Sequence, residues 1–121
     1  LGVRIMSEAM AKTRERGLRA WIHSQHQLYF SRFASRRVVL EAFKASVSTD
    51  VSMVAERIAV PTLLIAAERD DITPVAAQYK LQALFTDARL EVIPSVGHLI
   101  HYEVPEEAAG YIDDFLTRRP A

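Results

Sequence analysis

Residues 58–74 read IAVPTLLIAAERDDITP, and this stretch decides the fold. Within it, residues 62–67 form an apolar run, which is typical of a parallel strand covered on both faces. The polar residues 68–72 predict a turn. Thr73-Pro74 then predicts the start of a helix, with Thr73 as its N-cap and Pro74 at its first position.

The segment that follows this helix repeats the pattern. Residues 90–116 read LEVIPSVGHLIHYEVPEEAAGYIDDFL, in which a second strand over 89–93 is followed by a loop and then by a last helix from about Pro105. Because a helix connects the two strands, the right-handed crossover rule makes them parallel neighbours. The apolar spacing of the last helix predicts that it buries Ala108, Ala109, Ile112, Phe115 and Leu116.

Residues 1–58 predict helices only. Their apolar spacing indicates helices over about residues 3–16, which Gly17 ends, 18–33 and 35–47, and a short fourth helix after the N-cap cluster Ser48-Thr49-Asp50. The fold class is therefore α/β, with a helical segment 1–58 followed by a parallel β-α-β-α unit in 59–121. Two apolar parallel strands normally have further strands beside them, so we expect the chain to be part of a larger fold.

The composition excludes several classes of protein. Half of the 121 residues are hydrophobic and 25% are charged, which is typical of one globular domain. The absence of Cys excludes disulfides, thiolate nucleophiles and cysteine-rich zinc sites. No apolar run is long enough to span a membrane and no signal peptide is visible, although the chain begins with Leu1 and not Met. We expect a cytoplasmic location.

The net charge of zero conceals an asymmetry along the chain. Nine Lys/Arg and three Asp/Glu precede Thr49, whereas six Lys/Arg and twelve Asp/Glu follow from Thr49 onward. A basic face for an anionic substrate, a membrane surface or nucleic acid is one interpretation. We favour solvated helical faces, or halves that dock on each other, because the basic residues are spread over three expected helices.

Asp70 and His98 are the candidate catalytic residues. Each follows a predicted parallel strand at its C-terminal end, where open α/β sheets place their ligand sites. A carboxylate there can accept a hydrogen bond from the imidazole Nδ1–H, and so stabilise the imidazolium that forms when Nε2 takes a proton. Gly97 permits a tight loop before His98. Singly, each residue is better explained as a turn cap or a loop histidine; together they indicate catalysis.

The two quoted stretches resemble the C-terminal part of α/β-hydrolases. Residues 58–74 resemble the segment in which a Val-Pro-led strand precedes the loop with the triad acid, and residues 90–116 are similar to the closing strand, Gly-His loop, Glu-x-Pro and final helix. The resemblance implies that Asp70 is the triad acid and His98 the general base. Asp71 occupies the more variable place after the acid. Residues 1–58 would then be the helical cap.

The sequence lacks the nucleophile that this resemblance requires. None of the four Gly residues frames a Ser, Asp or Cys as in Gly-x-Ser-x-Gly, the nucleophile elbow of this fold. The family's order of elements implies that the nucleophile precedes the cap, in a missing N-terminal part. Ser95 is a poor substitute, because it lies three residues before His98 in the same loop.

Two further groups of residues have alternative interpretations. His23 and His26 are three apart on a predicted helix, as are His98 and His101 near a loop, and such pairs can bind a metal. We expect no metal, because no carboxylate completes the set. Four aromatic residues of the helical segment line an acyl pocket or, as we favour, form the core of the cap: Trp21, Tyr29, Phe30 and Phe33.

The resemblance implies a hydrolase that cleaves an ester, a lactone or a similar small-molecule bond without a cofactor. We expect the chain alone to be inactive, with no nucleic-acid partner, and to associate with the missing N-terminal half or with a second copy. A non-catalytic association module is one alternative. The other is a basic helical module that binds an anionic surface through Arg14, Arg16, Arg19, Arg36 and Arg37.

Overall fold

A computed structural model describes residues 2–30, 32, 35–48 and 50–118. The helical segment contains α1 (Gly2–Met10), α2 (Arg16–Phe30), α3 (Arg36–Ser48) and two 3₁₀ turns, η1 (Val51–Met53) and η2 (Ala55–Arg57). The sheet and its helices follow as β1 (Thr62–Ala67), α4 (Val75–Gln82), β2 (Ala88–Ile93), α5 (Ile100–Glu103) and α6 (Pro105–Thr117). None of the helices in the described ranges is long and apolar enough to cross a membrane.

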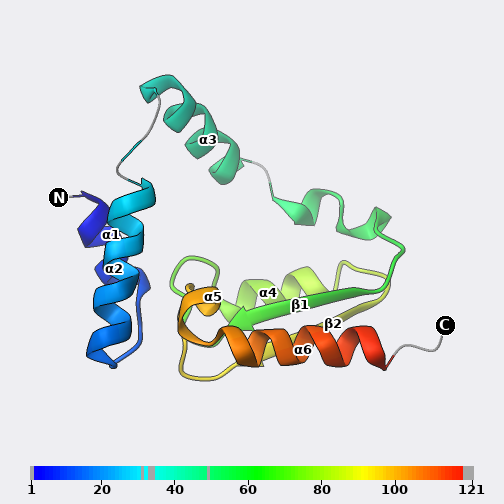
Figure 1. Ribbon diagram of the computed structural model, residues 1–121. Coiled ribbons are helices and arrows are strands. Elements are labelled where there is room, and N and C mark those ends of the chain that lie inside the picture. The colour runs from blue at the N-terminus through cyan, green and yellow to red at the C-terminus, as the bar shows by residue number, and fades with distance from the viewer. Residues whose placement is uncertain (1, 31, 33–34, 49, 119–121) are drawn as a thin grey trace.

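The sheet confirms the predicted β-α-β unit. Strands β1 and β2 pair in parallel, in a register that runs from Thr62 opposite Ala88 to Ala67 opposite Ile93. Helices α4 and α6 lie on opposite faces of the two strands (Figure 1). Ala67, Ile93 and Val96 form the buried centre of this part, and side chains of α5 and α6 pack against them. Both strand ends that carry the candidate residues are therefore anchored in the core.

Helices α1 and α2 form a hairpin that contacts the other part through α5 (Figure 1). Ala11, Ile22 and Leu99 are the buried residues of this contact, and Leu18 and Tyr102 pack against them. The hairpin therefore lies directly beside the loop that ends in His98, since Leu99 is the next residue of the chain.

Gly17 does not end the first helix, so that prediction was wrong. Helix α1 stops at Met10, and Gly17 is the second residue of α2. The Glu15 carboxylate accepts hydrogen bonds from the backbone N–H groups of Gly17 and Leu18, which caps the start of α2. The chain leaves the helix after Met10 because the Glu103 carboxylate binds the next backbone groups, described below.

Other expectations also needed correction. Pro74 is the N-cap of α4 and Thr73 lies outside the helix, because the Thr73 side chain binds Asp70 instead. The short fourth helix is two 3₁₀ turns, of which Asp50 caps the first through Ser52. The short α5 was not predicted, and the second helix ends at Phe30; Phe33 and Thr49 lie outside the described residues.

Several apolar surfaces have no cover within the described residues. No side chain described in α3 is buried, and the helix lies away from the sheet (Figure 1). In α6, Ile112 and Leu116 are 47% and 66% exposed and Ala109 is exposed, so the predicted burial of these three residues was wrong, whereas Ala108 and Phe115 are half-buried. In the described part of the chain β1 pairs only with β2, which leaves its other edge open.

Candidate active site

Asp70 follows β1 in a turn that fixes its carboxylate from several directions. Its side chain is almost buried, and Oδ1 accepts hydrogen bonds from the backbone N–H groups of Ile72 (2.8 Å) and Thr73 (2.9 Å). Oδ2 accepts the Thr73 hydroxyl at 2.6 Å. Burial by itself raises the pKa of Asp70, but the hydrogen bonds from Thr73, His98 and Ile72 outweigh it and hold this pKa below its usual range. The carboxylate is thus kept ionised.

His98 completes the pair from the loop after β2. Its Nδ1 lies 2.9 Å from Oδ2 of Asp70, which confirms the predicted approach of the two side chains. Whereas the Asp70 side chain is only 6% exposed, that of His98 is 34% exposed, so the imidazole connects the buried carboxylate with the surface. Asp71 points elsewhere and pairs with Lys12 at 2.5 Å. Of the two neighbouring aspartates, Asp70 is therefore the one that faces His98.

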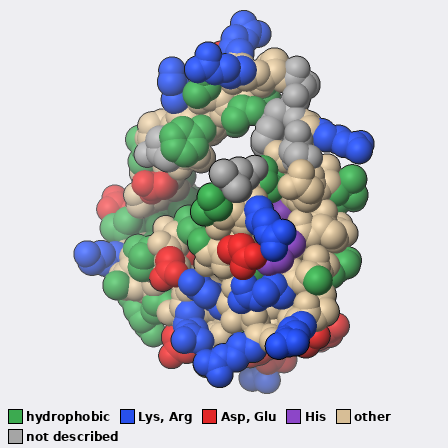
Figure 2. Space-filling model, turned by 90° about the vertical axis from the view of Figure 1, so that its left-hand side faces the viewer, with side chains coloured by type: hydrophobic (Ala, Val, Ile, Leu, Met, Phe, Trp, Pro, Cys, Tyr) green, Lys and Arg blue, Asp and Glu red, His purple; other side chains and the backbone are tan. Residues whose placement is uncertain are grey.

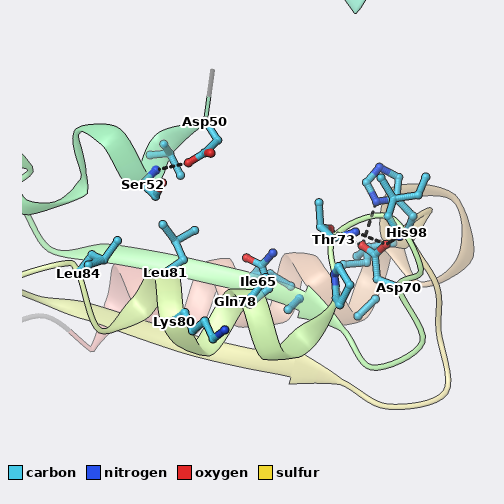
Figure 3. A pocket seen from close by; sticks show the side chains of 17 residues that line it. Asp50, Ser52, Ile65, Asp70, Thr73, Gln78, Lys80, Leu81, Leu84 and His98 are labelled. Carbon is cyan, nitrogen blue, oxygen red and sulfur yellow. Dashed lines mark hydrogen bonds and ion pairs between the residues drawn. The ribbon is translucent and has the colours of Figure 1, made fainter. Parts of the chain in front are cut away.

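A pocket of about 760 Å³ begins at this pair. It runs along β1 between η1 and α4, with Asp70, Thr73 and His98 at one end and Leu84 toward the other (Figure 3). Three successive β1 residues, 65–67, line it; because successive side chains of a strand point to opposite faces, the pocket follows the open edge of the strand. The wall is mainly apolar, and the acid–base pair is its principal polar feature at that end.

Gly97 allows the helical hairpin to approach the loop of His98. A Cβ atom at this position would overlap Cγ of Lys12 and lie 3.1 Å from the Met10 carbonyl oxygen. The adjoining loop, residues 11–15, is held by Glu103, whose Oε1 accepts the backbone N–H groups of Lys12 (2.5 Å) and Thr13 (3.0 Å). The absence of a side chain at position 97 thus sets how closely the hairpin lies to the candidate site.

Ser95 is not brought to His98. Its side chain lines a different pocket, its backbone N–H donates to Oε2 of Glu68 at 2.7 Å, and its φ of 65° places it in the left-handed region. Thr73 is the residue that the sequence analysis missed, because it was assigned to a helix cap. The spacing Asp-x-x-Thr is a recognisable signal, since such side chains hydrogen-bond backbone groups two or three residues away.

The side chains of His23 and His26 form hydrogen bonds within the hairpin. Their Nδ1 atoms lie 2.6 and 2.8 Å from one Oγ atom, that of buried Ser7. Burial, followed by the charges of His23 and His101, lowers the pKa of His26. His101 is exposed and packs on the Tyr102 ring. Within the described ranges, no three or more His, Cys, Asp or Glu side chains are grouped to hold a metal ion.

The aromatic and basic residues of the hairpin do not line the pocket. Trp21 packs edge-on against Tyr102 at 5.3 Å between ring centroids, and Tyr29 and Phe30 are largely exposed. Three of the five arginines in the basic-module hypothesis are engaged or lie apart from the hairpin. Arg19 is bound to Glu8 and to the carbonyl groups of Ala11 and Thr13, while Arg36 and Arg37 lie on the distant α3.

Comparisons with known proteins identify the family of the fold. A family model described as "alpha/beta hydrolase fold" matches residues 8–105. Over 63 residues the chain is 36% identical to the 2-hydroxy-6-oxo-6-(2'-aminophenyl)hexa-2,4-dienoic acid hydrolase of Metapseudomonas resinovorans, an alignment that covers 52% of this chain and 22% of that protein.

Two solved structures resemble nearly the whole chain. The esterase EaEST from Exiguobacterium antarcticum has a TM-score of 0.75 at 20% identity, covering 94% of this chain and 41% of the esterase. Est816, described as an N-acyl homoserine lactone degrading enzyme, has a TM-score of 0.66 at 26% identity, covering 94% of this chain and 45% of Est816. The chain thus spans less than half the length of these proteins. Because the family model matches most of its residues, the chain belongs to the alpha/beta hydrolase fold family.

Proposed function

We propose that this chain supplies the acid and the general base of a hydrolase that acts on an ester, a lactone or a similar small-molecule bond. The observation that carries the proposal is the Asp70–His98 hydrogen bond at the end of an apolar pocket, beyond the C-terminal ends of two parallel strands. The names of the relatives, a dienoic acid hydrolase and a lactone-degrading enzyme, support small organic substrates.

The chemistry follows from the orientation of the imidazole. Since Nδ1 faces the Asp70 carboxylate, Nε2 is the atom available to take a proton from a nucleophile. Asp70 stabilises the resulting imidazolium, and its own hydrogen bonds keep it ionised in that role. His98 then gives this proton to the leaving group as the acyl intermediate forms. In the second half of the reaction the neutral ring takes a proton from water, which attacks the acyl intermediate, and returns that proton to the nucleophile as it is released.

The nucleophile and the oxyanion-binding groups are proposed to come from a part of the enzyme outside these 121 residues. We assign residues 1–58 to the cap and 59–121 to the C-terminal part of the core domain. The open edge of β1 and the exposed apolar residues of α3 and α6 support a missing N-terminal half as the partner, or else a second copy of the chain.

Mutation of His98 tests this function in the full gene product. Hydrolysis of p-nitrophenyl acetate and of an N-acyl homoserine lactone is measured for the parent and for His98→Ala, which should lose activity by at least roughly 10³-fold because proton transfer to and from the nucleophile is removed. His101→Ala is the matched control, since His101 is exposed and does not line the pocket. Equal activity of His98→Ala and the parent would refute the assignment.

A further inference from the structure

A second pocket, of about 440 Å³, lies between the hairpin and the loops that carry the candidate residues. The hairpin contributes Lys12, Thr13 and Arg14, from the loop between α1 and α2. The other part contributes Arg69, Ser95 and Glu103 among others. Since Arg69 directly precedes Asp70 and Ser95 lies in the loop of His98, the pocket touches both catalytic loops without including either candidate residue.

Two of the cations in this pocket lack ion-pair partners within the described residues: the exposed guanidinium groups of Arg14 and Arg69. The other two charged residues that line the pocket, Lys12 and Glu103, have partners within the described chain. Lys12 pairs with Asp71, and the Glu103 carboxylate, the acid of the pocket, accepts two backbone N–H groups. Figure 2, which looks onto the side of the hairpin, shows Lys and Arg side chains gathered over the lower part of that face. Among the residues that line the pocket, the three cations Lys12, Arg14 and Arg69 outnumber the one acid, Glu103, so the lining carries a net positive charge.

The backbone conformation of Ser95 is a second, independent observation that supports a ligand site in this pocket. It is the one non-glycine residue with a positive φ in the described ranges, and the Glu68 carboxylate holds its backbone N–H. A side chain in the left-handed conformation is uncommon and persists where its surroundings fix it, often at ligand-binding sites. Ser95 lines the same pocket as Arg14 and Arg69, and a serine hydroxyl can donate a hydrogen bond.

We propose that this pocket binds a small multivalent oxyanion of the phosphate or polycarboxylate type, which joins Arg14 of the hairpin to Arg69 of the core. Guanidinium groups bind such oxygens in pairs and with charge assistance, which suits this ligand class. A bound oxyanion fixes the hairpin against the loops of Asp70 and His98, so the pocket is an effector site. It is distinct from the pocket of the proposed hydrolysis.

Trp21 provides the signal for a direct test. It is the only Trp of the chain and packs on Tyr102 where the hairpin meets α5, so its fluorescence reports the docking of the hairpin. We titrate the full gene product with inorganic phosphate and with citrate, at an ionic strength held constant with NaCl, and subtract the signal of a Trp21→Phe variant to isolate that of Trp21. Saturable fluorescence changes are expected, and the tighter of the two ligands identifies which kind of oxyanion the site prefers.

Three variants separate the pocket from the general basic surface. Arg14→Ala and Arg69→Ala should each weaken binding at least tenfold. Arg16→Ala, an exposed neighbour that does not line the pocket, should bind as the parent does. Far-UV circular dichroism checks that each variant folds, and ³¹P NMR line broadening measures phosphate binding without using Trp21. Equal weakening by all three variants, or no response beyond that to NaCl, would overturn the proposal. Because this readout needs no catalysis, it stands or falls separately from the proposed hydrolase activity.

Discussion

Oδ2 of Asp70 lies 2.9 Å from Nδ1 of His98 and also accepts the Thr73 hydroxyl at 2.6 Å. The carboxylate therefore faces the imidazole with a fixed oxygen, while backbone N–H groups hold its other oxygen. This arrangement orients the ring and selects the tautomer in which Nδ1 carries the proton.

Asp70→Asn tests that relationship in the full gene product. The amide preserves the shape of the side chain but can no longer stabilise the imidazolium, so kcat should fall by roughly 10³–10⁴-fold. Esterase kinetics measure the loss. Asp71→Asn is the control, because this exposed neighbour pairs with Lys12 and does not touch His98. A larger loss in the control than in Asp70→Asn would reverse the assignment of the acid.

The same carboxylate should make stability depend on acid pH. Its hydrogen bonds lower the pKa of Asp70 in the folded state below the usual value of 3.8, so it adds stability above that pH, and this contribution disappears as the pH falls through the folded pKa. Urea unfolding between about pH 5 and pH 2.5 measures the effect. Asp70→Asn should show a smaller decrease over this range; an unchanged slope would contradict the prediction.

His26 should affect stability in a different pH range. Its folded-state pKa is lowered from 6.5 mainly by burial, so the neutral ring is favoured, and its contribution is complete above pH 6.5 and decreases as the pH falls toward the folded pKa. The groups around it are Ser7, His23 and Phe30 of the hairpin, and Tyr102 and His101 of α5.

Trp21 fluorescence and urea unfolding between about pH 7.5 and pH 5.5 follow this change. His26→Asn, which retains a polar group near Ser7 but cannot titrate, should be insensitive in that range. A decrease as large as that of the parent would assign the effect to another group.

Two glycine substitutions should act with opposite signs. In Gly97→Ala the new Cβ meets Lys12 and the Met10 carbonyl, so the hairpin must move, at a cost of about 1–3 kcal/mol of stability. Gly110 lies within α6 with no atom within 4 Å of its added Cβ, so Gly110→Ala should stabilise by about 0.5–1 kcal/mol. Urea unfolding compares the two. Destabilisation of similar size at both positions would show that the contact with Lys12 is unimportant.

The free chain is expected to self-associate. Strand β1 exposes one edge, and Phe43 of α3 and Leu116 of α6 are more than 60% exposed, so burial of these surfaces against another chain is favourable. Analytical sedimentation at low micromolar concentration measures the state. A monodisperse monomer that unfolds cooperatively would show that the chain closes its own core.

The elements defined by local patterns were predictable from the sequence, whereas those defined by distant contacts were not. The apolar run of β1, the strand pattern of β2 and their helical connection predict a parallel pair, and this pairing brings Asp70 and His98 together. The end of α1 was missed because it depends on Glu103, which is 91 residues away from Lys12. The exposure of α6 was missed because helical spacing shows which face is apolar but not whether anything covers it.

The two hydrogen bonds from the loop after α1 to Glu103 affect which substitutions this loop can tolerate. The carboxylate holds main-chain N–H groups, which every residue except proline provides, so the anchor does not depend on which side chains occupy positions 12 and 13. Substitutions at these two positions can therefore change the side chains beside the loops of Asp70 and His98, while the hydrogen bonds from the backbone to Glu103 are kept. This anchor between the hairpin and α5 is thus set by the side chain at position 103 and by the backbone, not by the side chains, at positions 12 and 13.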